Sequence, residues 1–278
     1  MSRLDGKTAV VTGAGGGIGR SLAHRFADQG MAIALLDNDE TSLGAAAKSV
    51  RESGADTFEA LVDVSDAAAM TSVGNNVLSW RDDVHILCNN AGIGACGAIW
   101  EIENETWSQA VNVNVLGVVN GLRAFVPHLV ERGEGHIVNT ASMAGLVSRP
   151  LWSPYVATKF AVVGLTECLY LELQNTAPAI DVSVLCPGPV STEFLNPDRI
   201  SIAAGGSGSA REAELKEVVE FGHQKMQELG ISPDEAADCV IAGVLERRFY
   251  IFTHPAMKGE IERRHNDLMA GGAPSLQR

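Results

Sequence analysis

The chain has 278 residues, of which 46% are hydrophobic and 20% are charged, and its formal net charge is −13. This length and composition fit one large domain with a substantial core. Because nucleic acids and anionic membranes attract proteins with a basic surface, the strong acidity argues against both as partners.

Short β-rich runs alternate with longer helical patterns along the chain. The predicted strands are Thr8–Thr12, Ala32–Asp37, Thr57–Val62, Val84–Asn89, Gly135–Thr140, Asp181–Cys186 and Tyr250–Phe252. The predicted helices cover residues 18–29, 40–53, 66–80, 104–132, 153–176 and 233–247. This alternation predicts an α/β fold, a doubly wound parallel sheet of about seven strands with helices on both faces. No repeat or linker divides the chain, so we expect residues 1–278 to form a single domain.

A glycine-rich loop follows the first predicted strand. It reads Gly13-Ala14-Gly15-Gly16-Gly17-Ile18-Gly19 and opens a helix. Glycines let the backbone turn tightly beside a pyrophosphate, and the free N–H groups of a helix N-terminus attract its charge. The second predicted strand ends in Asp37, 18 residues after Gly19, where a carboxylate can accept hydrogen bonds from an adenosine ribose. The loop and the acid together predict a dinucleotide site.

Asp37 also bears on the choice of dinucleotide. A carboxylate at this place repels a 2′-phosphate, and Gly16 and Asn38 stand where an Arg or Lys would help to bind one. The sequence therefore predicts NAD rather than NADP as the cofactor. At the end of the third strand, Asp63 and Val64 are expected at the adenine, the alternative for Asp63 being to cap the following helix.

Two predicted helices, 104–132 and 153–176, are apolar nearly all round. A helix without a wet face is buried on both sides. One side would pack on the sheet, and the other would pack either on a neighbouring subunit or beneath loops of the same chain. We expect a homo-oligomer, a dimer or a tetramer, that assembles through these two helices.

Tyr155 and Lys159 stand four residues apart in the helix 153–176, so they share one helix face. A cation beside a phenol stabilises the phenolate, which predicts that Lys159 lowers the pKa of Tyr155 from its usual value of about 10 towards neutral pH. Such pairs also arise by chance. Ser142 favours the functional interpretation, because it follows the fifth strand at the edge where open α/β sheets bind ligands, although a turn or cap is the alternative there.

Two segments lie outside the regular alternation. Ile202–Ala210 is rich in glycine and serine, and we interpret it as part of a substrate loop or lid over about 189–225, the alternative being a surface loop without a role. The C-terminal extension, about 255–278, carries a charged helical pattern. It either covers the site of a neighbouring subunit or lies on the surface.

Together, these motifs resemble those of the short-chain dehydrogenase/reductase family, in its ordinary-length NAD-binding branch. The resemblance runs from about Gly6 to Phe252. It rests on Thr12-Gly13-x-x-x-Gly17-Ile18-Gly19, Asn89-Asn90-Ala91-Gly92, Asn114 in Asn114-Val115-Leu116-Gly117, Ser142, Tyr155-x-x-x-Lys159 and Pro187-Gly188. It implies a Rossmann-type fold and an NAD-dependent oxidoreductase that acts on CH–OH groups.

The resemblance also implies roles for single residues. Tyr155 would be the general base in alcohol oxidation and the general acid in ketone reduction, and Ser142 would donate to the substrate oxygen. Lys159 would hydrogen-bond the nicotinamide ribose, and Asn114 would hold a water that connects Lys159 to solvent. For Thr192, beside the nicotinamide, an N-cap is the alternative. The residues expected at the cofactor are Gly13, Gly15, Gly17, Ile18, Gly19, Asp37, Asp63, Val64, Asn90, Ala91, Gly92, Tyr155, Lys159, Pro187, Gly188, Val190 and Thr192.

Residues 93–100, 143–153 and 189–225 are expected to surround the substrate. Their large side chains are mainly apolar: Ile93, Cys96, Ile99, Trp100, Met143, Leu146, Val147, Leu151, Trp152, Phe194, Leu195 and Phe221. The closest contacts are expected from Ser142, Trp152, Tyr155 and Phe194. We therefore expect an uncharged, hydrophobic secondary alcohol or ketone, of the aromatic or terpenoid kind that similar bacterial family members use. Arg149 and Arg199 keep an acidic substrate open.

Two other functions stay open: a dinucleotide-binding sensor without turnover, and an epimerase or dehydratase that oxidises its substrate transiently. The seven histidines show no metal-ligand spacing, so no metal site is expected. The five cysteines are widely spaced, odd in number and without a CxxC pair, and the chain opens on a polar segment. These features favour reduced thiols in a soluble, cytoplasmic protein.

Overall fold

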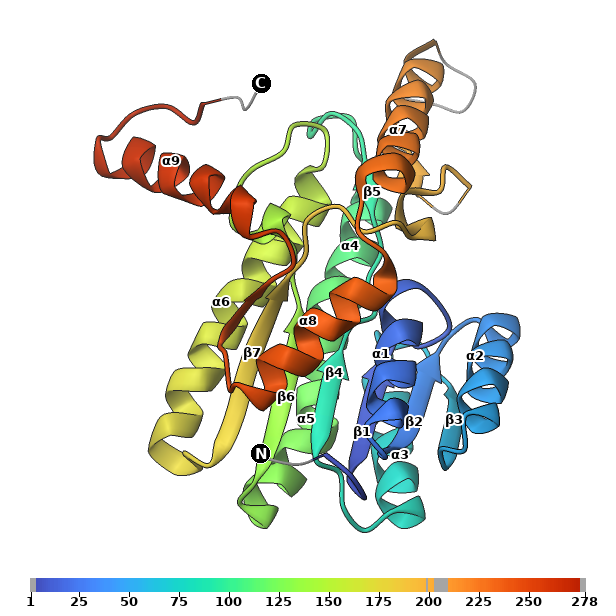
Figure 1. Ribbon diagram of the computed structural model, residues 1–278. Helices are drawn as coiled ribbons and strands as arrows, with labels where there is room; N and C mark the ends of the chain where they lie inside the picture. The colour runs from blue at the N-terminus through green and yellow to red at the C-terminus, as the bar shows by residue number, and fades with distance from the viewer. Residues whose placement is uncertain (1–3, 199, 203–209, 276–278) are drawn as a thin grey trace.

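The computed structural model describes residues 4–198, 200–202 and 210–275, with a parallel sheet of seven strands at its centre (Figure 1). The strands are β1 Thr8–Thr12, β2 Ala32–Asp37, β3 Thr57–Leu61, β4 Ile86–Asn89, β6 Gly135–Thr140, β7 Ile180–Cys186 and β9 Tyr250–Phe252. They pair in the order β3-β2-β1-β4-β6-β7-β9, and every pairing is parallel. This confirms the predicted fold class and places each predicted strand within two residues of its observed bounds.

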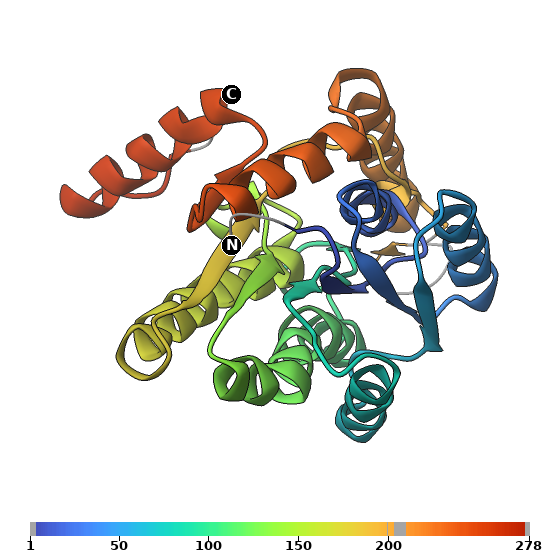
Figure 2. The same ribbon diagram turned by 60° about the horizontal axis from the view of Figure 1, so that its bottom comes forward.

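Helices cover both faces of this sheet (Figure 2). They are α1 Gly17–Asp28, α2 Glu40–Glu52, α3 Ala67–Trp80, α4 Asn104–Val111, α5 Gly117–Arg132, α6 Ser153–Thr176, α7 Ala210–Leu229, α8 Pro233–Leu245 and α9 Lys258–Met269. α1, α2 and α8 share one buried cluster with the sheet, whereas α3 and α5 share another. The helices therefore enclose both faces of the sheet. The edge at which the strands end in loops stays accessible to a ligand.

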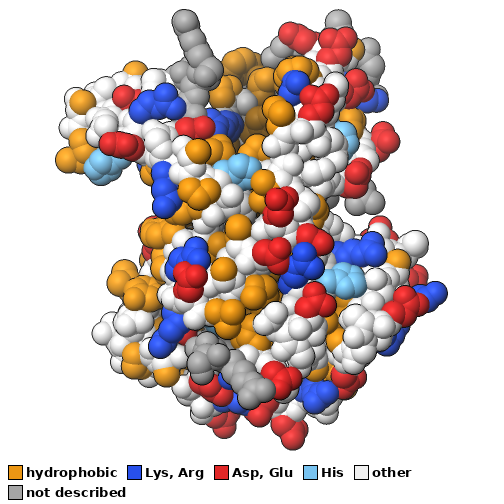
Figure 3. All heavy atoms as spheres, in the orientation of Figure 1, with side chains coloured by type: hydrophobic (Ala, Val, Ile, Leu, Met, Phe, Trp, Pro, Cys, Tyr) orange, Lys and Arg blue, Asp and Glu red, His pale blue; other side chains and the backbone are white. Residues whose placement is uncertain are grey.

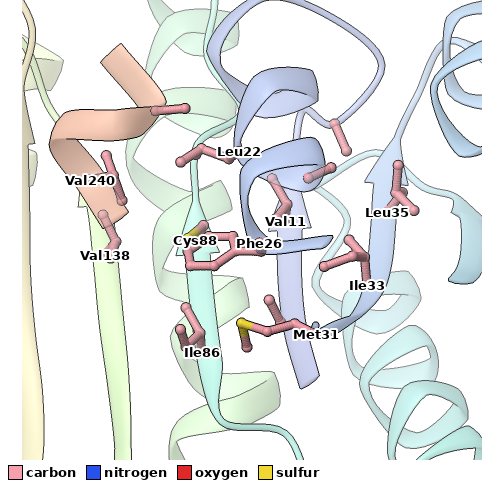
Figure 4. Close-up of a cluster of buried hydrophobic side chains, with 14 of the residues drawn as sticks. Val11, Leu22, Phe26, Met31, Ile33, Leu35, Ile86, Cys88, Val138 and Val240 are labelled. Atoms are coloured by element: carbon pink, nitrogen blue, oxygen red, sulfur yellow. The ribbon is translucent and has the colours of Figure 1, made fainter. Parts of the chain in front are cut away.

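Successive side chains along each strand point to opposite faces of the sheet, so each strand contributes residues to both clusters. In Figure 4, Val11, Ile33 and Ile86 surround Phe26 of α1, and Val240 of α8 lies next to Val138 in the same cluster. The residues one position along belong to the opposite cluster, which contains Val10, Ala34, Leu87, Phe125 and Leu129. A core of this kind holds the strands in one register, because a shift by one residue would exchange the two faces.

The predicted helix 104–132 is not one continuous α-helix. α4 ends at Val111, a π-helical turn (η1) covers Asn112–Leu116, and α5 continues from Gly117. Asn114 lies in this turn and is fully buried. The apolar pattern predicts a helix here but does not reveal the extra residue in the turn, a feature that often marks functional sites.

The predicted lid region, 189–225, contains regular structure that was not predicted. A two-residue parallel sheet joins β5 Ala95–Cys96 to β8 Ser201–Ile202, and the 20-residue helix α7 follows. The sequence of α7 begins Ala-Arg-Glu-Ala-Glu-Leu-Lys-Glu, and these residues favour helix. Most of the segment predicted to be mobile, residues 203–209, lies outside the described residues.

The C-terminal extension begins with a short 3₁₀ turn, η4 Pro255–Met257, and continues as α9, which leaves the body of the protein near the top of α6 (Figure 1). Ile261, in the second turn of α9, packs against a third buried cluster that includes Met143 and Val162. The rest of α9 is mostly exposed. Only the beginning of the extension is therefore attached to the core.

The stretch Asn104–Arg132 is long and apolar enough to cross a membrane by length and composition. In this fold its α5 part packs on the sheet through Phe125 and Leu129, both fully buried. Core helices of soluble proteins pass the same test of length and composition. The apolar pattern therefore gives only weak support for a membrane span.

Candidate active site

A cleft of about 1430 Å³ lies at the edge of the sheet where the strands end. It is lined by residues that follow four strands: Gly13 and Gly15–Ile18 after β1, Asn90–Gly94 after β4, Ala141–Ala144 after β6 and Pro187–Val190 after β7. The strand order reverses between β1 and β4, and a crevice forms there because the neighbouring connections run to opposite faces. The residues predicted at the cofactor line this cleft except Gly19, and so do the four predicted closest substrate contacts, Ser142, Trp152, Tyr155 and Phe194. The catalytic candidate Asn114 is buried behind the cleft surface.

The glycine loop is shaped for close approach of backbone to a ligand. Gly13 has a φ of +65°, and a Cβ there would lie 2.9 Å from Cα of Ala91. A Cβ at Gly19 would lie 2.0 Å from the carbonyl oxygen of Gly13. α1 then begins without a side-chain cap and without an acidic residue in its first turn. Its first N–H groups and the positive end of its dipole are suited to a pyrophosphate.

Asp37 is held at the rim of the cleft by two backbone hydrogen bonds. Its carboxylate accepts the N–H of Gly15 at 2.8 Å and the N–H of Asp39 at 3.0 Å. Arg20, exposed on the first turn of α1, also lines the cleft. Arg20 was not predicted at the cleft, because Gly16 and Asn38 were the only positions expected to bear on a 2′-phosphate.

The two alternatives for Asp63 separate in the structure. The cap of α3 is Asp66, which accepts the N–H groups of Ala68 and Ala69, so the capping interpretation of Asp63 is wrong. Asp63 lines the cleft and accepts the N–H of Ser65 at 2.8 Å.

Thr12 joins the loops after β1 and β4. Its Oγ1 accepts the N–H groups of Asn90 at 2.9 Å and Ala91 at 3.1 Å, and Asn90 Nδ2 donates to the Thr12 carbonyl at 3.2 Å. The sequence motif that contains Thr12 predicted no separate role for this residue. The hydroxyl fixes the distance between the glycine loop and the segment Asn90–Gly92.

Tyr155 and Lys159 project from α6 toward Ser142, which follows β6. Lys159 is buried, its Nζ donates to the carbonyl oxygen of Thr140 at 2.8 Å, and it lies 5.6 Å from the centre of the Tyr155 ring. Ser142 caps the short turn η2 Met143–Gly145 by accepting the N–H of Ala144 at 3.1 Å, and it hydrogen-bonds with Tyr155. The cap that was the alternative for Ser142 is therefore present, and it fixes a hydroxyl that faces the phenol, while the role of Ser142 toward the substrate stays a prediction.

The pKa of Tyr155 is shifted in the direction opposite to the prediction. Burial raises the pKa of Tyr155 to about 12, and the hydrogen bond with Ser142 only partly offsets this. Burial also lowers the pKa of Lys159, to about 8. The prediction considered only the nearby cation, whereas loss of hydration dominates at both residues.

Asn114 connects three parts of the site. Its Oδ1 accepts the N–H of Ile93 at 2.8 Å, and its Nδ2 donates to the Ile93 carbonyl and to Thr158 Oγ1, both at 3.0 Å. The side chain thus holds the loop after β4 to α6, beside Lys159. This anchoring was not predicted, and the water-holding role stays a prediction.

The substrate side of the cleft combines predicted and missed residues. Phe194 lies with its ring centre 5.2 Å from that of Tyr155, and Trp152 lines the same space. Thr192 caps the turn η3 Glu193–Leu195, as the alternative for it expected, and it also lines the cleft, while its place beside the nicotinamide stays a prediction. Missed residues are Met226 and Leu229 of α7 and Met257 of the C-terminal extension. Figure 3 shows hydrophobic side chains gathered in the hollow between α9 and α7.

Apolar spacing in α7 could have located part of this wall. Leu215, Val219, Gly222, Met226 and Leu229 follow intervals of three and four residues, as on one face of a helix. For Met257 the sequence carries no comparable signal.

Several predicted substrate residues lie elsewhere. Cys96 and Val147 are buried, Ile99, Trp100 and Phe221 are exposed, and Leu146 and Leu151 do not line the cleft. Arg149 does line it, and Arg199 lies outside the described residues. In the part of the chain that the structure describes, no group of three or more His, Cys, Asp or Glu residues is arranged to hold a metal ion.

Comparison with known proteins agrees with this geometry. A model of the short chain dehydrogenase family matches residues 7–201. The chain is 32% identical over 268 residues to 1-deoxy-11-beta-hydroxypentalenate dehydrogenase of Streptomyces avermitilis, across 95% of this chain and 91% of the relative.

Solved structures show the same similarity. A short-chain dehydrogenase/reductase of Burkholderia phymatum in complex with NAD has a TM-score of 0.93 and 35% identity, over 100% of this chain and 99% of that one. An alcohol dehydrogenase of the archaeon Thermococcus sibiricus, complexed with 5-hydroxy-NADP, has a TM-score of 0.72 and 28% identity, over 89% and 96% of the two chains.

Proposed function

Because the chain belongs to the short-chain dehydrogenase/reductase family of oxidoreductases, which bind a nicotinamide dinucleotide, we propose that it transfers a hydride between a secondary alcohol or ketone and NAD. The observation that carries the proposal is the convergence of Ser142, Tyr155 and Lys159 on the cleft that the glycine loop also lines. Hydride transfer needs the reacting carbon and a proton-transfer group at one place, and this cleft offers both.

Tyr155 is the proposed acid and base. In alcohol oxidation its phenolate takes the hydroxyl proton, and in ketone reduction its phenol returns a proton to the carbonyl oxygen. A bound NAD would supply the hydride-accepting ring and, in its oxidised form, a positive charge that favours the phenolate. Lys159 is the chain's own cation nearby, because a pKa of about 8 leaves it mostly protonated at neutral pH.

Ser142 and Asn114 are proposed to support this proton transfer. The hydrogen bond between Ser142 and Tyr155 lowers the pKa of the phenol, as expected when the serine donates to the phenol oxygen. When a substrate binds, the hydroxyl of Ser142 would turn to donate to the substrate oxygen instead. Asn114 would fix the position of Ile93 and Thr158 and hold the water that connects Lys159 to solvent.

The preference for NAD rests on Asp37. Its carboxylate, fixed by Gly15 and Asp39, would repel a 2′-phosphate and bind the ribose hydroxyls. Arg20, a cation that lines the same cleft, would bind the pyrophosphate of the cofactor. Solved relatives carry either NAD or an NADP analogue, so the comparison of the two cofactors has to be made on this protein.

An uncharged, hydrophobic substrate is proposed from the cleft walls. Trp152, Phe194, Met226 and Met257 supply apolar surface beside Tyr155. The name of the Streptomyces avermitilis relative, which describes the dehydrogenation of a hydroxy compound, supports a CH–OH substrate. Secondary alcohols with an aromatic ring or a terpenoid skeleton fit these walls best.

The proposal is tested with a panel of secondary alcohols and NAD at alkaline pH, by following NADH absorbance. Wild-type protein should reduce NAD with some of these alcohols, and Tyr155→Phe should lose at least about a hundred-fold in rate. Activity of the variant within a few-fold of wild type would show the mechanism to be wrong. Binding of NAD without turnover would favour a sensor, and conversion without net NADH an epimerase or dehydratase.

We also propose a homo-oligomer, a dimer or a tetramer, that assembles through α4–α5 and α6. Large apolar side chains are exposed there, among them Leu116 at 44% and Leu171 at 63%. Light scattering at micromolar concentration should give a dimer or a tetramer, and a monomer would contradict the proposal. A cytoplasmic location is also proposed, because the five cysteines are free. We further propose that the chain forms a single domain. Its lid would include α7, whose Met226 and Leu229 line the cleft.

A further inference from the structure

We propose that the segment Thr253–Arg264, named the strap from here on, selects uncharged substrates. In this proposal Met257 is an apolar contact of the substrate, and Glu260 neutralises Arg149 on the substrate side of the cleft. The inference rests on the proposed function in one respect, namely that the part of the cleft beside Tyr155 receives the substrate.

Met257 reaches the cleft from the C-terminal extension. A Cβ placed on Gly188 would lie 2.8 Å from the sulfur of Met257 and 2.6 Å from Nδ1 of His254, so the strap packs directly on the Gly188 backbone. Pro187 and Gly188 line the same cleft, and Met257 lines it beside them. A thioether at this place offers a polarizable, adaptable surface to an apolar group.

Glu260 pairs with the cation that lines the substrate side. Arg149 Nη2 donates to Glu260 Oε2 at 2.5 Å, and the side chains are only 31% and 19% exposed. Lys159 beside Tyr155 belongs to the proposed proton transfer, and a further cation of the cleft, Lys225, pairs with Glu228 of its own helix, with both partners nearly half exposed. Partial burial makes the Arg149–Glu260 pair the better shielded of the two, so its charges cancel locally.

The strap is attached to the site at both ends. At its start, the N–H of Gly188 donates to Thr253 Oγ1 at 3.0 Å. At its end, the guanidinium of Arg264 lies over the ring of Phe160, 4.9 Å from its centre, and Phe160 is the residue after Lys159. These attachments hold Met257 at the cleft and Glu260 against Arg149, although both residues follow the last strand of the sheet.

Charge selection follows from this arrangement. With Glu260 present, a substrate carboxylate near Arg149 would meet a neutral pair and would lose hydration without a compensating charge. Glu260→Gln keeps the shape of the side chain and removes its negative charge. The cleft then gains one positive charge, which should favour an anionic ligand over its neutral isostere on the order of five-fold.

The test uses two ketones of nearly equal shape, 4-acetylbenzamide and 4-acetylbenzoate, whose dissociation constants are measured by calorimetry with saturating NAD, the oxidised cofactor, which cannot reduce them. Wild type should prefer the amide. In Glu260→Gln the affinity ratio should shift towards the benzoate roughly five-fold, and adding Arg149→Gln should reverse this shift. The matched control, Glu262→Gln, changes an exposed glutamate of the same helix that does not line the cleft and should leave the ratio unchanged.

Met257→Ala should weaken both ketones by the same factor, roughly five-fold, because it removes apolar contact without changing charge. An unchanged ratio in Glu260→Gln, the same shift in Glu262→Gln, or no binding of either ketone to wild type would each overturn the inference. Reduction of the ketones by NADH is measured in parallel. If wild type reduces neither ketone but the ratio shifts as expected, the proposed reaction fails and the charge selection stands.

Discussion

We expect His136 to make the protein sensitive to mild acid. This histidine of β6 is fully buried, and its Nε2 lies 2.7 Å from Oγ of Ser183, which itself donates to the carbonyl of Arg248. Because the hydroxyl proton of Ser183 is used in that bond, Nε2 must carry the proton of the neutral ring. Nδ1 has no hydrogen-bond partner among the described residues. A second proton would therefore be placed on a buried, unsolvated nitrogen.

The magnitude follows from the pKa. Burial lowers the pKa of His136 to about 4, from about 6.5 in the unfolded chain. As the pH falls below 6.5, His136 binds a proton in the unfolded state but stays neutral in the folded state. The free energy of unfolding therefore decreases between about pH 6.5 and pH 4. Between pH 8 and pH 5 this single group should lower the free energy of unfolding by about 2 kcal/mol.

The assay is urea unfolding followed by circular dichroism at pH 8 and pH 5, at one protein concentration because an oligomer is proposed. The loss between the two pH values should be smaller in His136→Gln than in wild type by about 2 kcal/mol. His265→Gln, which changes an exposed histidine, serves as the control and should behave like wild type. Equal losses in wild type and His136→Gln, within about 0.5 kcal/mol, would refute the reasoning.

Three further substitutions test the cleft. Gly19→Ala places a Cβ 2.0 Å from the Gly13 carbonyl oxygen, so we expect loss of NAD binding by calorimetry and a lower melting temperature, and normal binding would contradict the role of the loop. Asn114→Ala removes the acceptor of the Ile93 N–H and should lower the free energy of unfolding, measured in urea, by about 1–3 kcal/mol. An unchanged free energy of unfolding would show that the hydrogen bonds of Asn114 do not stabilise the fold. Asp37→Ser should shift the kcat/KM ratio of the two cofactors at least about ten-fold towards NADP, and a constant ratio would show that Asp37 does not select NAD.

The fold and most of the cleft lining could be predicted because they depend on local sequence. Alternating strand and helix patterns predicted the seven strands, and the glycine loop, Asp37, Ser142 and Tyr155 each follow or lie in one of these elements. Since parallel strands end at the same edge, such residues meet whatever the details of packing. Their convergence on one cleft is thus a consequence of topology.

The missed features depend on contacts that no local pattern records. The π-helical turn around Asn114 could not be predicted from the hydrophobic period, which over so short a turn is the same as that of an α-helix. The helix α7 was not predicted because a glycine-rich run comes before it. The direction of the Tyr155 pKa shift was wrong because burial depends on every segment around the ring.

By itself, the sequence determined the sheet, the dinucleotide loop and the Tyr155–Lys159 pair, because each is defined within one element or at its end. Only the tertiary structure decided the composition of the substrate wall. Met257, which lines the cleft, comes from the chain beyond the last strand, and Glu260 of the same segment meets the lining residue Arg149 across 111 residues. Packing and loss of hydration bring such distant groups together, and these act between elements rather than along the sequence.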